Sequence, residues 1–266
     1  MTKKYFIIGN PVKHSLSPKI HNFWFKQNNI DATYEKKEIS ESKLPEMVKD
    51  IRDDKIYGIN VTVPFKQKII PFLDKLSDLA KKTESVNTVY KIDNEVVGDN
   101  TDVYGFKMSL INQNIELKDK IAFIIGAGGV VPSIITALKD LSIKKIFLTN
   151  RTFSKIEKLK IEHPELQLLK WGEITNFDIV INATSVGLNF EDKIDINFKN
   201  LKDHKIFYDT IYNPPMTNFL SEAKLGGHNF LNGKLMLIYQ AQKAFQNWNN
   251  LLPNLDKQFF DFIKDD

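Results

Sequence analysis

Residues 121–131 read IAFIIGAGGVV and decide the fold class of this chain. The first five residues form a continuous apolar run, which is typical of a strand buried on both faces of a sheet. The glycine-rich turn is followed by an expected helix at 131–141 and a second expected strand at 145–149. This order predicts a βαβ dinucleotide-binding unit, with a plain glycine-rich turn as the alternative. Val131 stands where the usual pattern has Gly or Ala, so we expect the helix and the strand to lie slightly further apart.

The end of the second strand indicates which dinucleotide the unit binds. A site for NAD places Asp or Glu there to accept a hydrogen bond from the ribose. This chain has Asn150, Arg151 and Thr152, followed by Lys155, and no acid. Arg151 can bind an adenosine 2′-phosphate through charge-assisted hydrogen bonds, and Thr152 offers a hydroxyl where a helix begins. We therefore predict NADP, with a surface arginine at a strand end as the alternative.

Two later expected strands, at 177–184 and 205–210, also end in polar or aromatic residues. The first ends with Thr184 and Ser185, and the second continues into Ile211 and Tyr212. A nicotinamide lies at the carboxyl edge of a Rossmann sheet, where both endings are expected. Each ending by itself is more often typical of a turn than of a functional site.

The first hundred residues also alternate between strands and helices. Strands are expected at 5–9, 32–39 and 58–63, with helices at 17–29 and 40–53. An amphipathic helix is expected at 65–82, with a kink or restart at Pro71. A further strand is expected at 85–90, and a helix at 104–112. The strands and helices up to residue 63 predict right-handed crossovers around a parallel sheet.

The strand at 58–63 leads into a candidate functional lysine. Residues 58–66 read GINVTVPFK, and Pro64 must end the strand because it cannot donate to a sheet ladder. Lys66 follows directly. A lysine just beyond a strand end can project into the crevice where α/β sheets bind ligands. The alternative is a solvated lysine at the start of a surface helix.

Four other polar residues are candidates for binding. Ser15 and Ser17 lie between a strand and a helix, where two hydroxyls suit a carboxylate or phosphate, and Ser17 before Pro18 is also a typical helix cap. Asp102 lies in the polar loop 98–105, in which we expect Asp99 and Asn100 to cap the next helix. Gln240 interrupts the apolar stripe of an expected helix at 235–249, so it binds either the protein or a polar ligand.

The composition excludes several classes of protein. The chain has 266 residues, 42% of them hydrophobic, and neither a signal peptide nor an apolar run long enough to span a bilayer is expected. Cysteine is absent and the five histidines are scattered, so no metal site is predicted. The net charge of +4 is spread over short pairs, which suits anionic small molecules and not nucleic acid. We expect a cytoplasmic protein.

Short motifs are spread along nearly the whole chain. They are HSLSP at 14–18, NVTVPFK at 60–66, NT at 87–88, NTDVYG at 100–105, GAGG at 126–129, NRT at 150–152, NATS at 182–185 and GKLMLIYQ at 233–240. In this order they closely resemble the shikimate dehydrogenase family. The resemblance implies an NADP-dependent oxidoreductase that reduces 3-dehydroshikimate to shikimate, in the route to chorismate and the aromatic amino acids.

The resemblance also implies a fold. It is an α/β fold in which a discontinuous substrate-binding domain, residues 1–103 and 234–266, accompanies a Rossmann NADP-binding domain, residues 104–233, with a cleft between them. The implied partners are a small-molecule substrate, no nucleic acid and no membrane, for a monomer or homodimer.

Carried over position by position, the resemblance implies roles for individual residues. Lys66 and Asp102 become the catalytic acid–base pair, and Ser15 and Ser17 bind the substrate carboxylate. The substrate-binding set is Ser15, Ser17, Asn60, Thr62, Lys66, Asn87, Asp102, Tyr212 and Gln240. The cofactor-binding set is Gly126, Ala127, Gly128, Gly129, Val130, Asn150, Arg151, Thr152, Lys155, Thr184, Ser185, Ile211, Gly233 and Met236. Val131 and Pro132 depart from the family pattern in the cofactor loop.

Two other functions remain open from the sequence. One is a related enzyme that also uses quinate, or NAD beside NADP. The other is a nucleotide-binding regulator that keeps the Rossmann unit and has lost its chemistry, against which the intact Lys66, Asp102 and Gln240 argue.

Overall fold

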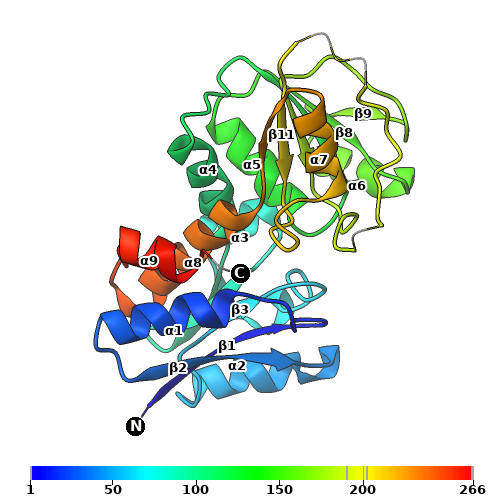
Figure 1. The fold of residues 1–266 in the computed structure, drawn as a ribbon. Coiled ribbons are helices and arrows are strands. Elements are labelled where there is room, and N and C mark those ends of the chain that lie inside the picture. The colour runs from blue at the N-terminus through cyan, green and yellow to red at the C-terminus, as the bar shows by residue number, and fades with distance from the viewer. Residues whose placement is uncertain (1, 190, 200, 202, 265–266) are drawn as a thin grey trace. The chain divides into compact units, whose positions relative to one another are not determined.

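The computed structural model describes residues 2–189, 191–199, 201 and 203–264, and it divides into two compact units (Figure 1). Unit 1 comprises Met1–Gly105 and Ile238–Asp266, and unit 2 comprises Phe106–Leu237. The chain passes between them within helices α4 (Asp102–Asn112) and α8 (Lys234–Asn249). Residues 1, 265 and 266 of the expected substrate domain, and 190, 200 and 202 of the expected NADP domain, lie outside the described residues.

Unit 1 contains a six-stranded sheet in the order β2-β1-β3-β5-β6-β4. Its strands are β1 (Lys3–Gly9), β2 (Ala32–Glu38), β3 (Gly58–Val61), β4 (Lys75–Leu76), β5 (Thr88–Ile92) and β6 (Glu95–Asp99). Its remaining helices are α1 (Ser17–Gln27), α2 (Leu44–Arg52), α3 (Asp78–Thr83) and α9 (Lys257–Phe262), with 3-10 turns η1 (Glu41–Lys43) and η2 (Ile70–Phe72).

The first three strands of this unit form the parallel sheet that the sequence predicts, and β5 and β6 extend it in antiparallel pairs. Strand β1 pairs in parallel with β2 and β3, but β5 pairs antiparallel with both β3 and β6. The hairpin β5–β6 turns at Asp93 and Asn94, both of which adopt positive φ. Asn and Asp tolerate that conformation, so the tight turn sends the chain straight back instead of through a crossover helix.

The helix expected at 65–82 is wrong for most of its length, and only the part in Asp78–Thr83 is α-helical. The chain there forms turns, η2, the short strand β4 and only then helix α3, whose N-cap is Ser77. Pro71 lies inside η2 and removes a main-chain donor. Leu73 and Leu76 still pack against the core of the unit, so the apolar spacing reflected burial without helical geometry.

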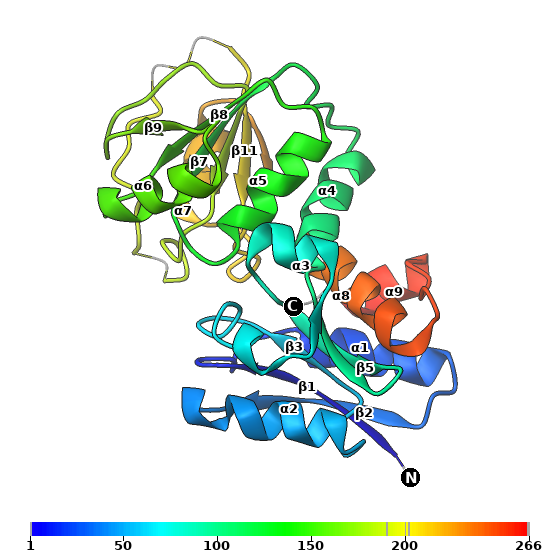
Figure 2. The ribbon, with the colours of Figure 1, turned by 180° about the vertical axis from the view of Figure 1, so that it is seen from behind.

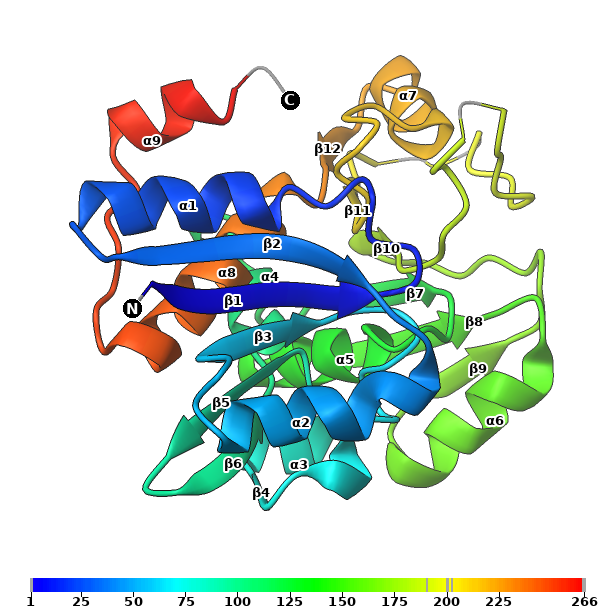
Figure 3. The same ribbon diagram turned by 90° about the horizontal axis from the view of Figure 1, so that it is seen from below.

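Helices α1 and α2 lie on opposite faces of the sheet of unit 1 (Figure 3). The buried side chains of α2 pack with Ile8, Ile59 and Val89 on one face. On the other face α1 contributes Trp24 and Phe25 to an aromatic layer. Alternate residues of each strand point to opposite faces, so one sheet carries both cores.

Unit 2 contains a six-stranded, fully parallel sheet in the order β12-β11-β10-β7-β8-β9. Its strands are β7 (Ile121–Ile125), β8 (Lys145–Thr149), β9 (Gln167–Leu169), β10 (Ile179–Asn182), β11 (Ile206–Asp209) and β12 (Asn229–Leu231). Its helices include α5 (Val131–Asp140), α6 (Phe153–Glu162) and α7 (Asn218–Leu225). This strand order is that of a doubly wound Rossmann sheet, which confirms the predicted α/β class and βαβ unit.

Helices cover both faces of this second sheet, with α7 on one side and α5 on the other (Figure 1, Figure 2). The α7 face is lined by phenylalanines, including Phe207 and Phe219, whose ring centroids are 5.1 Å apart. Strand order reverses beside β7, where β8 and β10 flank it on either side. Ligands of open α/β sheets bind at such a reversal, beyond the carboxyl ends of the strands.

A histidine lies inside the aromatic layer of unit 1. The ring of His21, on α1, stacks on Tyr34 at 4.4 Å between centroids and contacts Trp24 and Trp248. Neither ring nitrogen has a hydrogen-bond partner among the described residues. Burial disfavours the charged imidazolium and lowers the pKa of His21 to about 3. Folding therefore requires neutral His21.

We expect His21 to weaken unit 1 in mild acid. Below the unfolded pKa of 6.5 the unfolded chain binds a proton that the folded chain rejects, so stability falls as pH drops from 6.5 toward 3. Between pH 7 and pH 5 the loss is about 2 kcal/mol, at about 1.4 kcal/mol for each pH unit. His21→Phe keeps the stacking and should lose about 2 kcal/mol less over that interval.

The measurement is urea unfolding at both pH values in a Trp171→Phe background, where the remaining tryptophans, Trp24 and Trp248, both belong to unit 1. Equal losses with and without the His21→Phe substitution would contradict the depressed pKa.

Candidate functional site

Lys66 lies in the turns that follow β3 and does not begin a helix. Its main-chain oxygen accepts a hydrogen bond of 2.9 Å from the N–H of Val86, which fixes this segment against the chain before β5. Its ammonium forms an ion pair with Asp102, with 2.6 Å between Nζ and Oδ2. The exposed fractions of these two side chains are only 13% and 8%. The structure therefore brings together the two residues that the family resemblance implies as a catalytic pair.

Asp102 is held from two other sides. Its second carboxylate oxygen, Oδ1, accepts from Nδ2 of Asn87 at 2.9 Å. Its N–H donates to Oδ1 of Asn100 at 3.0 Å, and the N–H of Val103 donates to the same atom at 3.3 Å. Asn100 thus caps the first turn of α4, as the sequence predicts, and sets the direction in which the Asp102 carboxylate leaves the helix.

Asn87 connects the other polar candidates of unit 1. Its amide nitrogen also reaches Oγ1 of Thr101 at 2.9 Å and Oε1 of Gln240 at 3.3 Å. Its amide oxygen accepts from the N–H of Thr101 at 2.7 Å. Gln240 lies on α8, more than a hundred residues from Asn87. Buried amides need such partners, and here they gather carboxylate, amide and ammonium groups around one point.

Asn60 is buried next to this group. Its Nδ2 donates to the main-chain oxygen of Asn87 at 3.1 Å, and its Oδ1 accepts from the hydroxyl of Tyr34 at 2.7 Å. Sequence reasoning missed Tyr34. The signal was available, because a tyrosine in an expected strand needs a partner for its hydroxyl when it is buried.

The two serines before α1 lie together, but Ser17 is not the helix cap that the sequence predicts. The N-cap position belongs to Leu16, which makes no side-chain capping hydrogen bond. The hydroxyl of Ser15 accepts from the N–H of Ser17 at 3.2 Å and donates to the Ser17 hydroxyl at 3.2 Å. Ser15 therefore satisfies the N–H of the first residue of α1. Thr62, half-buried, follows the end of β3.

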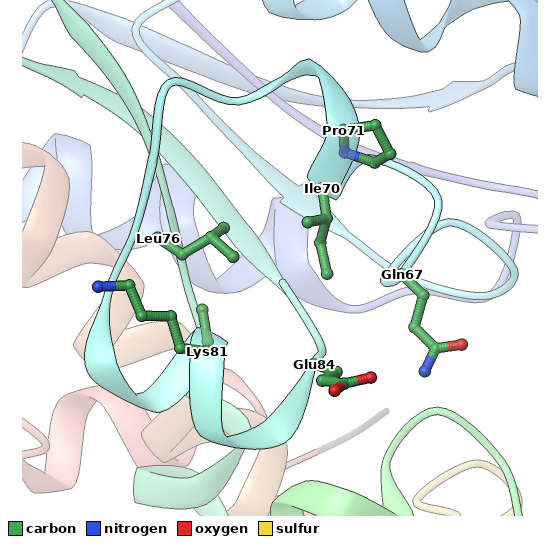
Figure 4. Close-up of a pocket in the computed structure, with 7 residues that line it drawn as sticks. Gln67, Ile70, Pro71, Leu76, Lys81 and Glu84 are labelled. Atoms are coloured by element: carbon green, nitrogen blue, oxygen red, sulfur yellow. The ribbon is translucent and has the colours of Figure 1, made fainter.

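Unit 1 also has a hollow of about 380 Å³ between η2, β4 and α3 (Figure 4). It is lined by Gln67, Ile70, Pro71, Leu76, Ala80, Lys81 and Glu84. None of the predicted substrate residues lines it. The chemistry described above lies with the Lys66 ion pair and not with this hollow.

In unit 2 the glycine-rich turn connects β7 to α5. Gly126 adopts φ +118°, and a Cβ there would lie 2.7 Å from the main-chain oxygen of Ala183. Only glycine fits this conformation and this close approach. Gly128 and Gly129 are exposed at the start of the helix. Backbone N–H groups at such a turn are suited to a pyrophosphate.

The exposed segment after β8 carries the residues predicted to select NADP. Arg151, Thr152 and Lys155 are all exposed, and Thr152 is the N-cap residue of α6. Neither Arg151 nor Lys155 forms an ion pair within the described part of the chain. Asn150 donates from Nδ2 to the main-chain oxygen of Thr152 at 2.8 Å, which shapes the turn.

The ends of β10 and β11 carry most of the remaining cofactor candidates. Thr184 is held by Asn182, whose Oδ1 accepts from its N–H at 3.1 Å and from its hydroxyl at 2.7 Å. Gly233 donates from its N–H to the oxygen of Ile211 at 2.9 Å. A Cβ on Gly233 would lie 2.1 Å from the oxygen of Thr210, so this contact needs glycine.

The other candidates of unit 2 differ in exposure. Ala127 and Val130 of the glycine-rich turn are half-buried, as is Tyr212, while Ser185 is exposed and Met236 is buried.

A buried carboxylate at this edge was missed by sequence reasoning. Asp209, the last residue of β11, accepts hydrogen bonds from Asn182 and from the N–H of Ile211, both at 3.0 Å. The signal was an acid at the carboxyl end of an apolar strand, two residues before the predicted residue Ile211.

The described residues contain neither a candidate membrane-spanning helix nor a candidate metal site. Within their ranges, no helix combines the length and apolar character needed to cross a membrane. The same part of the chain contains no group of three His, Asp or Glu side chains placed to hold a metal ion.

Family models match most of the chain. The model of the shikimate dehydrogenase substrate binding domain matches residues 7–89, within unit 1. The shikimate / quinate 5-dehydrogenase model matches residues 109–209, within unit 2.

Known proteins are similar to this chain over nearly its full length. A shikimate dehydrogenase (NADP(+)) of Pelagibacter ubique strain HTCC1062 is 53% identical over 99% of both chains. The crystal structure of a shikimate dehydrogenase in complex with NADP+ superposes with a TM-score of 0.92, at 32% identity, over 99% of this chain and 95% of that one. The shikimate 5-dehydrogenase of Thermus thermophilus, in complex with NADP(H) and shikimate, gives a TM-score of 0.88 at 31% identity, over 95% of each chain. This chain therefore belongs to the shikimate dehydrogenase family.

Proposed function

We propose that this protein catalyses the reversible, NADP-dependent reduction of 3-dehydroshikimate to shikimate, a step toward chorismate and the aromatic amino acids. The observation that carries the proposal is the buried ion pair of Lys66 and Asp102, 2.6 Å apart, to which Asn87 also binds. An ammonium held in this way suits the reduction of a ketone, because negative charge develops on the carbonyl oxygen. The names of the full-length relatives support the same reaction.

The substrate is a cyclic acid with several hydroxyl groups, and unit 1 offers matching groups. We assign Ser15 and Ser17 to the carboxylate. The Ser15 hydroxyl donates to Ser17, which leaves the Ser17 O–H to donate to an anion. Amides and hydroxyls suit the ring hydroxyls, and we assign these to Asn60, Thr62, Asn87, Asp102 and Gln240. We assign Tyr212 of unit 2 to the substrate as well.

Unit 2 fits NADP. A Cβ on Gly128 would meet only the oxygen of Ala183, at 3.6 Å, so the glycine-rich turn leaves open space beside its backbone. The segment after β8 offers the cations Arg151 and Lys155 and no acid before Glu157. This donor set suits a phosphate and not an unmodified ribose. We assign the 2′-phosphate to Arg151, Thr152 and Lys155, and the nicotinamide end to Thr184, Ser185, Ile211, Gly233 and Met236.

The chemistry divides between the bound cofactor and the protein. NADPH supplies the hydride that the carbonyl carbon at C3 receives. The ammonium of Lys66 donates a hydrogen bond to the carbonyl oxygen, stabilises its developing charge and gives it the proton. Asp102 orients the lysine and accepts from the neighbouring C4 hydroxyl. In the reverse direction neutral Lys66 takes the proton back.

The second candidate is a related enzyme that oxidises quinate beside shikimate. The family model that matches residues 109–209 is described as shikimate / quinate 5-dehydrogenase. This description supports the second candidate as an alternative. A regulator without chemistry is disfavoured, because Lys66, Asp102 and Gln240 are all present and grouped. The domain limits 1–103 with 234–266 and 104–233, a cytoplasmic location and a monomeric or homodimeric state stay predictions.

The first test is a spectrophotometric assay of purified protein with shikimate or quinate and NADP+ or NAD+. We expect kcat/KM to be highest for shikimate with NADP+, because the two serines and Arg151 suit that pair. A kcat/KM for quinate within about tenfold of that for shikimate would favour the second candidate. No reduction of either nucleotide would contradict both enzymes.

We expect Lys66→Ala to lower kcat strongly while substrate still binds. Loss of the proton donor should lower kcat roughly 10²- to 10⁴-fold. Binding of shikimate should weaken by no more than about tenfold, or about 1.4 kcal/mol. Steady-state kinetics and calorimetry measure the two effects. Lys68→Ala is the matched control, because this nearby lysine is exposed and pairs with Glu41 at the surface. If kcat survived within about tenfold, the role of Lys66 would be wrong.

We expect Arg151→Ala to weaken NADP+ selectively. Charge-assisted hydrogen bonds to the 2′-phosphate contribute about 1.5–3 kcal/mol, so KM for NADP+ should rise roughly 10- to 150-fold. KM for NAD+, which lacks that phosphate, should stay within about twofold. Lys158→Ala, at an exposed position on α6, is the control. Parallel increases for both nucleotides would contradict the assignment.

A further inference from the structure

Asp209 is a carboxylate buried without a cation. Its exposed fraction is 0%, and no lysine, arginine or histidine of the described residues forms an ion pair with it. Desolvation raises the pKa of Asp209 to about 6, although three hydrogen bonds act in the opposite direction. Burying a carboxylate in this way is costly, so its presence at this position calls for a function that an apolar residue could not supply.

The carboxylate joins three segments that are separate in the sequence. Oδ1 accepts from the N–H of Ile211 and from Nδ2 of Asn182, both at 3.0 Å. Oδ2 accepts from the hydroxyl of Thr217 at 2.7 Å. Thr217 in turn caps helix α7 by accepting from the N–H of Leu220. Asp209 therefore ties the chain after β11, the end of β10 and the start of α7 to one point.

Asn182 extends this connection to Thr184. Its oxygen accepts from both the N–H and the hydroxyl of Thr184, while its nitrogen also donates to the oxygen of Val186 at 3.1 Å. Asn182 is itself fully buried. With only neutral donors around it, the Asp209 carboxylate fixes the orientation of the Asn182 amide, since the NH₂ end must face the acid. The oxygen of Asn182 is thereby aimed at Thr184.

We propose that Asp209 is a positioning residue for the nicotinamide end of the cofactor, acting through the main chain at Ile211 and through Asn182 on Thr184. The inference rests on the proposed function, because the assignment of Thr184 and Ile211 to the cofactor is part of that proposal. Asp209 does not itself touch the cofactor, since it is fully buried. Strands β10 and β7 separate it from β8 and the segment that carries Arg151, so the adenosine end does not depend on it.

The test compares two ligands in the same variant. NADPH carries both ends of the cofactor, whereas adenosine 2′,5′-bisphosphate has the adenosine end and lacks nicotinamide. We expect Asp209→Ala to raise the Kd of NADPH at least about tenfold and to leave the Kd of the bisphosphate within about twofold. Fluorescence titration measures the first and calorimetry the second.

Two further variants separate positioning from a general loss of stability. Asp209→Asn keeps an oxygen for the donors of Ile211 and Asn182 and can turn its NH₂ toward Thr217, so NADPH binding should recover to within about threefold. Leu220→Ala removes a buried side chain from the phenylalanine-lined core on the α7 face and leaves the ends of β10 and β11 unchanged. It should raise the Kd of neither ligand by more than about twofold. Asn182→Ala should reproduce the selective loss of NADPH, and it replaces Asp209→Ala if that variant does not fold.

The outcomes distinguish this inference from the proposed function. If the wild-type protein reduces NADP+ with shikimate but Asp209→Ala binds NADPH normally, or loses both ligands equally, the inference alone is wrong. If the wild-type protein binds no NADPH and shows no turnover, the proposed function is wrong and this inference with it.

Discussion

The ion pair between Lys66 and Asp102 is the interaction on which the candidate site depends. Removing both charges from water costs several kcal/mol, and their attraction offsets this only where the remaining oxygens also have donors. Asn87 supplies such a donor to the free carboxylate oxygen, and Asn100 holds the main chain of Asp102. The cap of α4 and the chain before β5 are therefore parts of the site as well as of the fold.

The two buried aspartates, Asp102 and Asp209, have identical side chains but different surroundings, which suit them to different roles. Asp102 faces an ammonium that is 13% exposed, which leaves the pair accessible for the proton transfer that we propose. Asp209 meets only neutral donors and is fully buried, and burial raises its pKa to about 6. A carboxylate in that position can hold chain segments but cannot reach a ligand. In our proposal, Thr184 and Ile211 make the cofactor contacts, and Asp209 orients these two residues.

Helix α8 shows why part of the site could not be predicted by local reasoning. It carries Gln240, which bonds with Asn87, and Trp248, whose indole N–H donates to the hydroxyl of Thr88 at 2.9 Å. This helix near the end of the chain thus completes the layer around the first sheet. Periodicity identified Gln240 as an amide within an apolar stripe, but its partner lies 153 residues away and no spacing rule connects them.

The sequence by itself determined the features that depend on neighbouring residues. The apolar run before Gly126 and the turn after it specify the Rossmann unit, and the absence of an acid near Arg151 predicts NADP. Only the tertiary structure decided the rest. It placed Lys66 on turns and not in a helix, reversed the chain at β5, and brought Asp102 within 2.6 Å of the lysine. Hydrogen bonding and burial between distant segments settle these points, because local patterns do not record which segments pack together.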